Sequence, residues 1–430
     1  MTVSELIAAT HQRLAGQWAQ PVLRSGYVLV LNSVVTAVLG VGFWLLAARL
    51  YRPDVVGINT TAISAMMFLA GVAQLNLMSS LLRFVPTAGR AGGRLVGVAY
   101  LVGAGLSAAA AGIFLAGLAL WTPGLVPLLG QAPLAVSFVL ACAGWSVMVM
   151  QGSVLVALGR PGTTTLTNQI FNSLKLVLLL PLVLLAPASG VWLAWTAAMV
   201  VAVAAGFWFV FRRPAAAWPD DPSEALAGLP SLRELVRFAG PDYVGALAWI
   251  ACTTLVPILV LNLTDAEHAA AFALAWSICL VLYGVPTALG QALVVHGVRQ
   301  PSRVREHHAR VLWASLALLS PVAAVLVSFA PQVLALFGHW YAAEGAGTLR
   351  LLALSTLPNA VVALTVSRAR VDRRMSTIVA TMVTLCALVL GLTWLLVPPL
   401  GIIGAAVAWL VGQVTVAAGT SLVRTRPRAR

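Results

Sequence analysis

Apolar runs of about 20 residues recur along the chain, from Gly26 almost to its end. A helix of this length crosses the ~30 Å hydrocarbon core of a membrane, because each residue adds about 1.5 Å. Hydrophobic residues make up 60% of the 430-residue chain and charged residues only 9%, whereas a soluble domain carries roughly 25% charged residues. The sequence therefore predicts an all-α polytopic membrane protein and excludes a soluble globular one.

Twelve of these runs are long enough to be transmembrane helices. The predicted spans cover residues 26–48, 56–79, 95–119, 134–158, 163–186, 190–211, 237–262, 267–291, 309–330, 348–370, 375–398 and 401–422. A connection rich in proline and acidic residues separates the sixth span from the seventh, and such a composition breaks helices. We therefore expect two six-helix bundles of equal size.

The expected domains follow from these spans. They are a cytoplasmic segment at 1–25, a six-helix bundle at 26–211, a cytoplasmic linker with a short interfacial helix at 212–236, a second six-helix bundle at 237–422 and a basic cytoplasmic tail at 423–430. The interfacial helix is expected because Ser231 and Glu234 form a capping box ahead of span seven.

The two halves correspond weakly in sequence where each leaves its first span. LAARLYRPDVVGINTTAIS resembles LVLNLTDAEHAAAFALAWS, which places Ala270 of the second half at the position of Gly57. Two copies of six spans insert the same way round, so an axis along the membrane normal would relate them. The pattern predicts an internal duplication, in which a substrate path can run between the halves.

The arginines set the expected orientation. Nearly all of them fall in alternate connections, and the other connections hold only Arg49 and Arg52. Cytoplasmic loops carry the excess of positive charge in membrane proteins, so both termini should be cytoplasmic. The net charge of +14 is thus explained by topology, and we expect no nucleic-acid partner.

Lys175, the only lysine, lies near the middle of the fifth span. Its side chain cannot reach either membrane surface, and such a deep charge usually faces a bundle interior or an aqueous cavity. Thr164, Asn168 and Asn172 share its helical face. This stripe predicts a wet, cationic cavity wall, with a structural hydrogen-bond cluster between helices as the alternative.

Other polar residues give weaker signals. Gln74, Tyr283 and Gln291 lie on polar stripes of spans two and eight, where they can face a lumen or simply pack between helices. Asp242 is the only carboxylate that lies between the boundary residues of a predicted span, so it can couple transport to an ion or stabilise a helix N-terminus. Arg350 begins span ten and can contact an anion or extend to the membrane surface.

Enzyme signatures are weak in this sequence. The cysteines and histidines show no metal-binding spacing, and we expect no metal and no cofactor. The loops on the side opposite the termini are short and carry no paired acidic residues of the kind that membrane glycosyltransferases or polysaccharide polymerases place there. Such an enzyme is kept only as an alternative of another class.

Four stretches together resemble the Wzx-type polysaccharide-repeat flippases of the multidrug/oligosaccharidyl-lipid/polysaccharide exporter superfamily. They are LAARLYRPDVVG, LLRFVP, LFGHWYAAEGAGTLRLLALSTLPNAVVAL and LLVPPLGIIGAAVAWLVGQ. The resemblance extends over essentially the full chain, although each motif is mostly small and apolar. It implies a MATE-like fold of two six-helix bundles around a central lumen.

The resemblance also implies a function. A member of this family would carry an undecaprenyl-diphosphate-linked glycan from the inner to the outer leaflet of a bacterial cytoplasmic membrane by alternating access. Lys175 would then contact the diphosphate, Arg83 of LLRFVP would help to capture it, and Asp242 would be the candidate for coupling to a proton or sodium gradient. We expect a monomer with the bilayer and polysaccharide assembly proteins as partners.

An antiporter of drugs or metabolites, coupled to a cation gradient, is the alternative within the same superfamily. Drug antiporters of this superfamily commonly bind cations through acidic residues within membrane helices. The deep charge here is positive, which disfavours a cationic substrate.

Overall fold

The computed structural model describes residues 21–74, 77–88, 92–212, 232–299, 304–372 and 374–425, and within these ranges all regular structure is helical. Twelve helices are long: α2 (Pro21–Leu50), α3 (Pro53–Ala73), α5 (Gly92–Ala116), α8 (Ala132–Ala157), α9 (Pro161–Leu185), α10 (Gly190–Phe211), α11 (Leu232–Leu263), α12 (Ala266–Arg299), α13 (Val304–Ser328), α15 (His339–Val371), α16 (Met375–Leu400) and α17 (Ile402–Thr425). Short helices connect them: α4 (Leu77–Phe84), η1 (Val85–Thr87), α6 (Leu118–Trp121), η3 (Pro123–Leu125), α7 (Val126–Leu129) and α14 (Ala330–Ala335).

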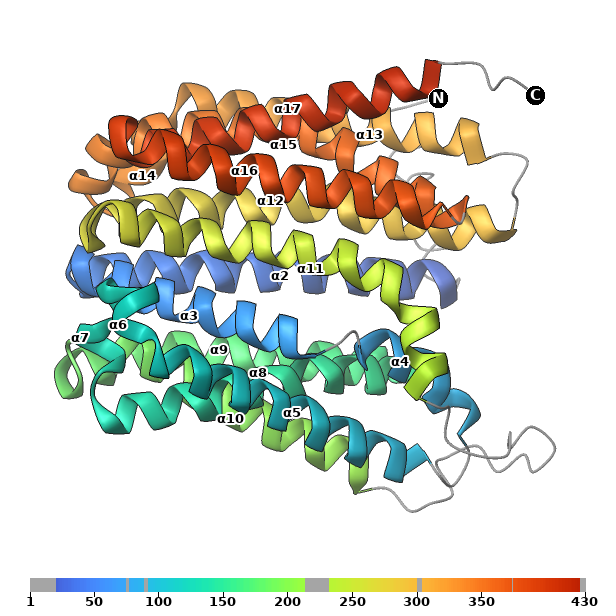
Figure 1. Ribbon diagram of the computed structural model, residues 1–430, viewed down its shortest axis with the longest axis horizontal. Helices are drawn as coiled ribbons and strands as arrows, with labels where there is room; N and C mark the ends of the chain where they lie inside the picture. The colour runs from blue at the N-terminus through green and yellow to red at the C-terminus, as the bar shows by residue number, and fades with distance from the viewer. Residues whose placement is uncertain are drawn as a thin grey trace, which may run out of the picture.

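The twelve long helices match the predicted spans. In the described residues, 11 helices are long and apolar enough to cross a membrane, and α2 contributes a shorter apolar segment at Val38–Leu50. The predicted all-α polytopic fold is confirmed, and the protein is a multi-pass membrane protein. The long helices run along one axis of the molecule, with α2 beginning and α17 ending at the same end (Figure 1).

Several helix ends differ from the prediction, and α12, for example, continues to Arg299 and not to 291. Span two was expected to reach residue 79, but α3 ends at Ala73 and the amphipathic α4 begins at Leu77. α15 begins at His339 and not at 348, after Gly338 turns the chain with a φ of 152° that favours glycine. The stretch expected to form a separate interfacial helix is the first part of α11, which runs unbroken from Leu232 to Leu263.

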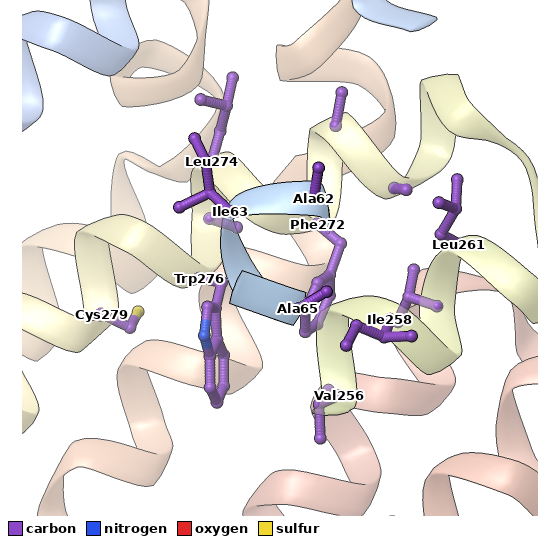
Figure 2. Packing of buried hydrophobic residues seen from close by; sticks show 14 of the residues in the cluster. Ala62, Ile63, Ala65, Val256, Ile258, Leu261, Phe272, Leu274, Trp276 and Cys279 are labelled. Carbon is purple, nitrogen blue, oxygen red and sulfur yellow. The ribbon is translucent and has the colours of Figure 1, made fainter. Parts of the chain in front are cut away.

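The two halves meet along α3 on one side and α11 and α12 on the other. Figure 2 shows Ala62 and Ile63 of α3 packed among α11 and α12 side chains, with Phe272 and Trp276 of α12 close by. We call this contact the seam. Small residues on α3 let the helices approach closely, which is how membrane helices associate in a solvent as apolar as their own side chains.

Gly57 marks the tightest approach in the seam. A Cβ atom built on Gly57 would lie 1.8 Å from the carbonyl oxygen of Ala266 and 3.1 Å from the backbone nitrogen of Ala270. Ala270 is the residue that the sequence comparison of the halves aligned with Gly57. The positions that the sequence comparison paired therefore lie against each other, and the internal duplication stays a prediction.

Hydrogen bonds join the halves at the end of the bundle where α2 turns into α3, which we call the Arg49 end. Arg49 Nε donates to the carbonyl oxygen of Leu336 at 2.7 Å, and Nη2 donates to that of Ala335 at 3.1 Å. Asn262 Nδ2 of α11 donates to the carbonyl oxygen of Trp121 at 2.7 Å. Backbone carbonyls at the ends of α14 and α6 thus accept bonds from the opposite half, which closes this end.

We expect Arg49→Gln to loosen the Arg49 end. The variant loses charged hydrogen bonds at an exposed site, together worth about 1 kcal/mol, so the open population should rise about fivefold. Spin labels at Leu120 of α6 and Leu400 of α16 would report a longer distance between the halves. Arg52→Gln is the matched control, because Arg52 pairs with Asp54 of its own half at 3.2 Å. An equal increase of the label distance in both variants would show that the Arg49 hydrogen bonds do not hold this end closed.

Candidate functional site

Lys175 lies inside the N-terminal half and not on its lipid-facing side. Its side chain is only 4% exposed. The ammonium nitrogen Nζ lies 4.2 Å from the ring centroid of Trp195 on α10, 4.8 Å from that of Phe171 and 4.9 Å from that of Phe43 on α2. Phe171 is one helical turn before Lys175 on α9, so its ring faces the same side. Three helices thus surround the ammonium with aromatic rings, which we call the Lys175 cage.

The cage stabilises a positive charge without neutralising it. Placing a lysine charge at the centre of a membrane costs about 2.5–3.5 kcal/mol of free energy, and each contact with an aromatic ring stabilises the charge by about 0.5–2 kcal/mol. Among the described side chains, no carboxylate forms an ion pair with Lys175. The indole Nε1 of Trp195 is also a buried donor without an acceptor in the described part of the chain. The Lys175 ammonium and the Trp195 indole are therefore two neighbouring donors that an anionic ligand could satisfy.

The polar stripe of α9 faces the interior of the same half. Asn172 is buried and its Nδ2 donates to the carbonyl oxygen of Asn168 at 2.8 Å. Thr164 Oγ1 donates to the carbonyl oxygen of Gly152 on α8 at 3.3 Å. The first part of the stripe therefore forms a hydrogen bond with α8, and its last residue, Lys175, contacts aromatic rings. The aromatic rings around this lysine were not anticipated from the sequence, and a role in a cavity wall or in a structural cluster stays a prediction.

A cavity of about 230 Å³ lies at the seam, where α3, α8 and α11 meet. We call it the seam cavity. Its lining includes Gln74, Trp145, Val149, Trp249, Thr253 and Thr254. Gln74 follows the last residue of α3, and its Nε2 donates to the carbonyl oxygen of Ser146 on α8 at 3.1 Å. Both halves of the protein therefore contribute walls to the cavity.

Trp145 connects the seam cavity to the Lys175 cage. Its ring centroid lies 6.0 Å from that of Trp195 and 6.1 Å from that of Phe171, the two rings nearest the ammonium. The predicted site residues Gln74 and Lys175 thus lie on either side of a thin aromatic layer. Sequence reasoning missed these aromatic residues, although Phe171 lies four positions before Lys175 and could have been assigned to its face.

Two other predicted residues lie elsewhere. Tyr283 is buried in the C-terminal half, where its hydroxyl pairs with Ser355 Oγ at 2.7 Å and donates to the carbonyl oxygen of Leu352 at 3.1 Å. Arg350 is exposed, and its Nε donates to the carbonyl oxygen of Val327 on α13 at 3.1 Å. Neither residue lines the seam cavity.

The remaining three predicted residues lie on α4, α11 and α12, near the end of the bundle opposite the Arg49 end. They are Arg83, Asp242 and Gln291. Their side chains lie outside the described part of the structure. Anion capture by Arg83, ion coupling by Asp242 and a lumen contact by Gln291 stay predictions.

Comparisons with known proteins found a family model that matches part of the sequence and solved structures that share the fold. Residues 244–397 match the family model MatE. No curated protein sequence matches the chain. An inward-facing multidrug resistance MATE family transporter of the MOP superfamily is 17% identical, with 90% of this chain and 93% of that chain covered and a TM-score of 0.66. The fold is that of the MATE transporters.

Two further solved structures share the MATE-like fold. The lipid II flippase MurJ in an inward closed conformation is 12% identical over 93% of this chain and 88% of its own, with a TM-score of 0.70. A MOP superfamily transporter from Pyrococcus furiosus, described by the reverse polarity of its binding pocket, is 15% identical over 91% of each chain, with a TM-score of 0.54. The MATE-like fold thus serves drug transporters and a lipid flippase, and the Wzx-type assignment stays a prediction.

Proposed function

We propose that this protein is an alternating-access transporter that flips an undecaprenyl-diphosphate-linked glycan from the inner to the outer leaflet of a bacterial cytoplasmic membrane. The observation that carries this proposal is the Lys175 ammonium, which is buried in the N-terminal half without a carboxylate partner among the described side chains. A diphosphate would supply the missing negative charge. In a medium of low dielectric constant that attraction is much stronger than in water.

The arrangement of the halves supports alternating access. The Arg49 end is closed by the contact of Gly57 with Ala266 and by the Arg49 and Asn262 hydrogen bonds. The loops at this end hold the two arginines that fall outside the expected cytoplasmic segments, so we assign it to the outer side. Release to the outer leaflet then requires these contacts to break while the halves rock about the seam.

A drug antiporter is the second candidate, and the MatE match and the drug-transporting structural relatives favour it. Binding a cationic drug inside the membrane needs a negative group. The described carboxylates lie in loops or near helix ends, as at Asp54, Glu306 and Asp372, and none lies in the Lys175 cage. The charge of the site therefore favours an anionic substrate. The Pyrococcus furiosus relative, with its reversed pocket polarity, is a precedent within this fold.

The proposed function is tested by deleting the gene and measuring lipid-linked glycans in each leaflet. We expect undecaprenyl-diphosphate-linked glycan to accumulate on the cytoplasmic side, and a plasmid copy of the wild-type gene to restore its export. Resistance to cationic dyes should not change. Unaltered glycan distribution together with increased dye sensitivity would favour the antiporter and overturn the flippase proposal.

A further inference from the structure

We propose that an apolar groove on the outside of the C-terminal half binds one anionic phospholipid of the inner leaflet, with an acyl chain in the groove and the phosphate beside Arg368. The groove lies between α13, α15 and α17, and we call it the lipid groove. Figure 1 shows α13 and α17 on the side of the molecule away from the N-terminal half. The groove shares no lining residue with the seam cavity or the Lys175 cage, so the site is separate from the proposed path of the substrate.

Every residue that lines the lipid groove is apolar. The lining includes Leu316 of α13, Pro358 and Val361 of α15, and Val414 and Ala418 of α17. The groove has a volume of about 370 Å³. The alanine side chain ends at Cβ and leaves a hollow between the longer leucine and valine side chains. At this depth in a bilayer, such a lining binds a hydrocarbon chain, because a polar group would be left without a hydrogen-bond partner.

The lipid groove lies about one leaflet away from the end of α15. That helix ends at Val371, ten residues after Val361, which corresponds to about 15 Å of helix. Half of the ~30 Å hydrocarbon core is also about 15 Å. The Arg49 bonds lie just before the start of α15, so its other end belongs to the inner side in the orientation assigned above. A phospholipid with its headgroup at the end of α15 therefore has its acyl chain at the depth of the groove.

Arg368 lies on the face of α15 that lines the lipid groove. It follows Val361 by seven positions, which is two turns of the helix, and its side chain is 22% exposed. Arg310 of α13 lies six positions before Leu316, and its side chain is 71% exposed. Two of the three helices therefore carry an arginine about 10 Å from the groove, toward the inner side.

Both arginines keep donors for a phosphate. Arg368 Nε lies 3.5 Å from Asp372 Oδ2, and Arg310 Nη2 donates to Glu306 Oε1 at 2.8 Å. A guanidinium group has five N–H donors, so one contact with a carboxylate leaves donors for the oxygens of a second anion. Because Arg368 is partly buried, solvent screens its charge less than the charge of a fully exposed arginine. Arg368 is therefore the main phosphate contact of the site.

The charge at the inner ends of α13 and α15 selects the headgroup. Residues 299–310 hold four arginines and one glutamate, and residues 368–374 hold four arginines and one aspartate. Basic residues near a membrane surface attract anionic lipids by about fivefold each. A zwitterionic headgroup carries an ammonium that the same arginines repel. Discrimination between headgroups distinguishes this site from the bulk lipid that covers every apolar helix face.

The size of the lipid groove favours an acyl chain over the prenyl chain of a lipid-linked glycan. Its volume of about 370 Å³ is near the lower limit of the roughly 300–1,000 Å³ of drug-sized sites. An unbranched acyl chain can lie in it as a single strand. An undecaprenyl chain has eleven isoprene units, each with a methyl branch, and most of it would lie outside the groove. The occupant is therefore a phospholipid.

Native mass spectrometry of the purified full-length protein tests the headgroup contact. The probes are phosphatidylglycerol and phosphatidylcholine with identical acyl chains, and the measurement is the ratio of their dissociation constants. We expect the wild type to bind phosphatidylglycerol about tenfold more tightly, because its net negative charge faces one partly buried and one exposed arginine. Arg368→Gln should lower this ratio about fivefold. Arg370→Gln is the matched control and should preserve the ratio, since Arg370 lies on the opposite face of the same helix.

A second pair of variants tests the lipid groove itself. Ala418→Trp fills the groove and should weaken the binding of both lipids about fivefold, the loss of roughly two buried CH₂ groups, without changing their ratio. Ala109→Trp at an exposed position of α5 is the control and should change neither affinity. The melting midpoint in detergent checks that each variant is folded. Ala418→Leu, with a smaller side chain, should weaken both affinities in the same direction and replaces the tryptophan variant where that variant unfolds.

Three results would overturn the proposal. Equal affinity of the wild type for the two lipids would show that the arginines do not select the headgroup. Unchanged binding by Ala418→Trp would show that lipid binds to the basic surface alone and not in the groove. Tighter binding of undecaprenyl phosphate than of phosphatidylglycerol, lost in both Ala418→Trp and Arg368→Gln, would assign the groove to the prenyl chain of the substrate.

Discussion

Lys175→Met is expected to abolish transport and to raise the thermal stability of the protein. The change removes a charge whose burial costs about 2.5–3.5 kcal/mol, and the methionine sulfur can keep contact with the surrounding rings. The same change removes the only cation of the cage. Truncating one partner of a buried charge pair costs about 2–5 kcal/mol, so the flipping rate should fall about 100-fold or more.

Two measurements are needed because a structural lysine and a functional lysine predict different results. The rate is measured by leaflet exchange of a fluorescent prenyl diphosphate in proteoliposomes, and the stability by the melting midpoint in detergent. Lys175→Arg keeps the positive charge among Phe43, Phe171 and Trp195 and should retain transport within about tenfold of the wild type. Normal transport by the methionine variant, or a lower melting midpoint, would contradict the role of the ammonium as an anion contact.

Gly57→Ala is expected to prevent closure of the Arg49 end. The added methyl group would lie 1.8 Å from the carbonyl oxygen of Ala266, well inside contact distance. The α3 backbone fixes the position of the methyl carbon and the carbonyl belongs to the backbone of α12, so neither group can rotate away. Overpacking of this kind costs about 1–3 kcal/mol, which corresponds to a shift of about 5- to 150-fold toward conformations in which α3 and α12 are apart. Transport should fall because the closed state is lost.

The measurement is the distance between spin labels at Leu120 and Leu400, which should lengthen in Gly57→Ala. Gly105→Ala on α5 is the matched control, since a Cβ atom there meets no other atom within 4 Å. Alanine is the better helix former, so this control should keep its transport and gain a little stability. An unchanged distance in Gly57→Ala would show that the contact between α3 and α12 does not control closure.

Much of the fold could be read from the apolar runs. The predicted span at residues 190–211 coincides with α10, and most other ends differ by a few residues. One larger error occurred at the end of α3, where the short helix α4 continues the apolar composition without continuing the span. The others occurred at the end of α12 and the start of α15, where the helix is longer than the predicted span. The length of an apolar run shows how many consecutive residues are apolar, but it does not show where the helix ends. A helix end depends on local turns such as the one at Gly338.

The candidate site was only partly predictable. The depth of Lys175 follows from its position in a span, and its helical face follows from the polar residues spaced around it. Its neighbours do not follow, because Phe43 and Trp195 come from α2 and α10. That Gln74 and Trp249 line one cavity was equally hidden, since nothing in either span specifies its partner helix.

The sequence by itself determined that this chain crosses a membrane about twelve times, and that one lysine lies deep within the fifth crossing. These properties follow from the bilayer, which demands apolar helices of fixed length and makes every buried charge conspicuous. Only the tertiary structure decided that rings surround the lysine and that Gly57 meets Ala266. In lipid, an apolar face is equally compatible with every neighbour, so helix partners are selected by shape and by small residues that permit close approach.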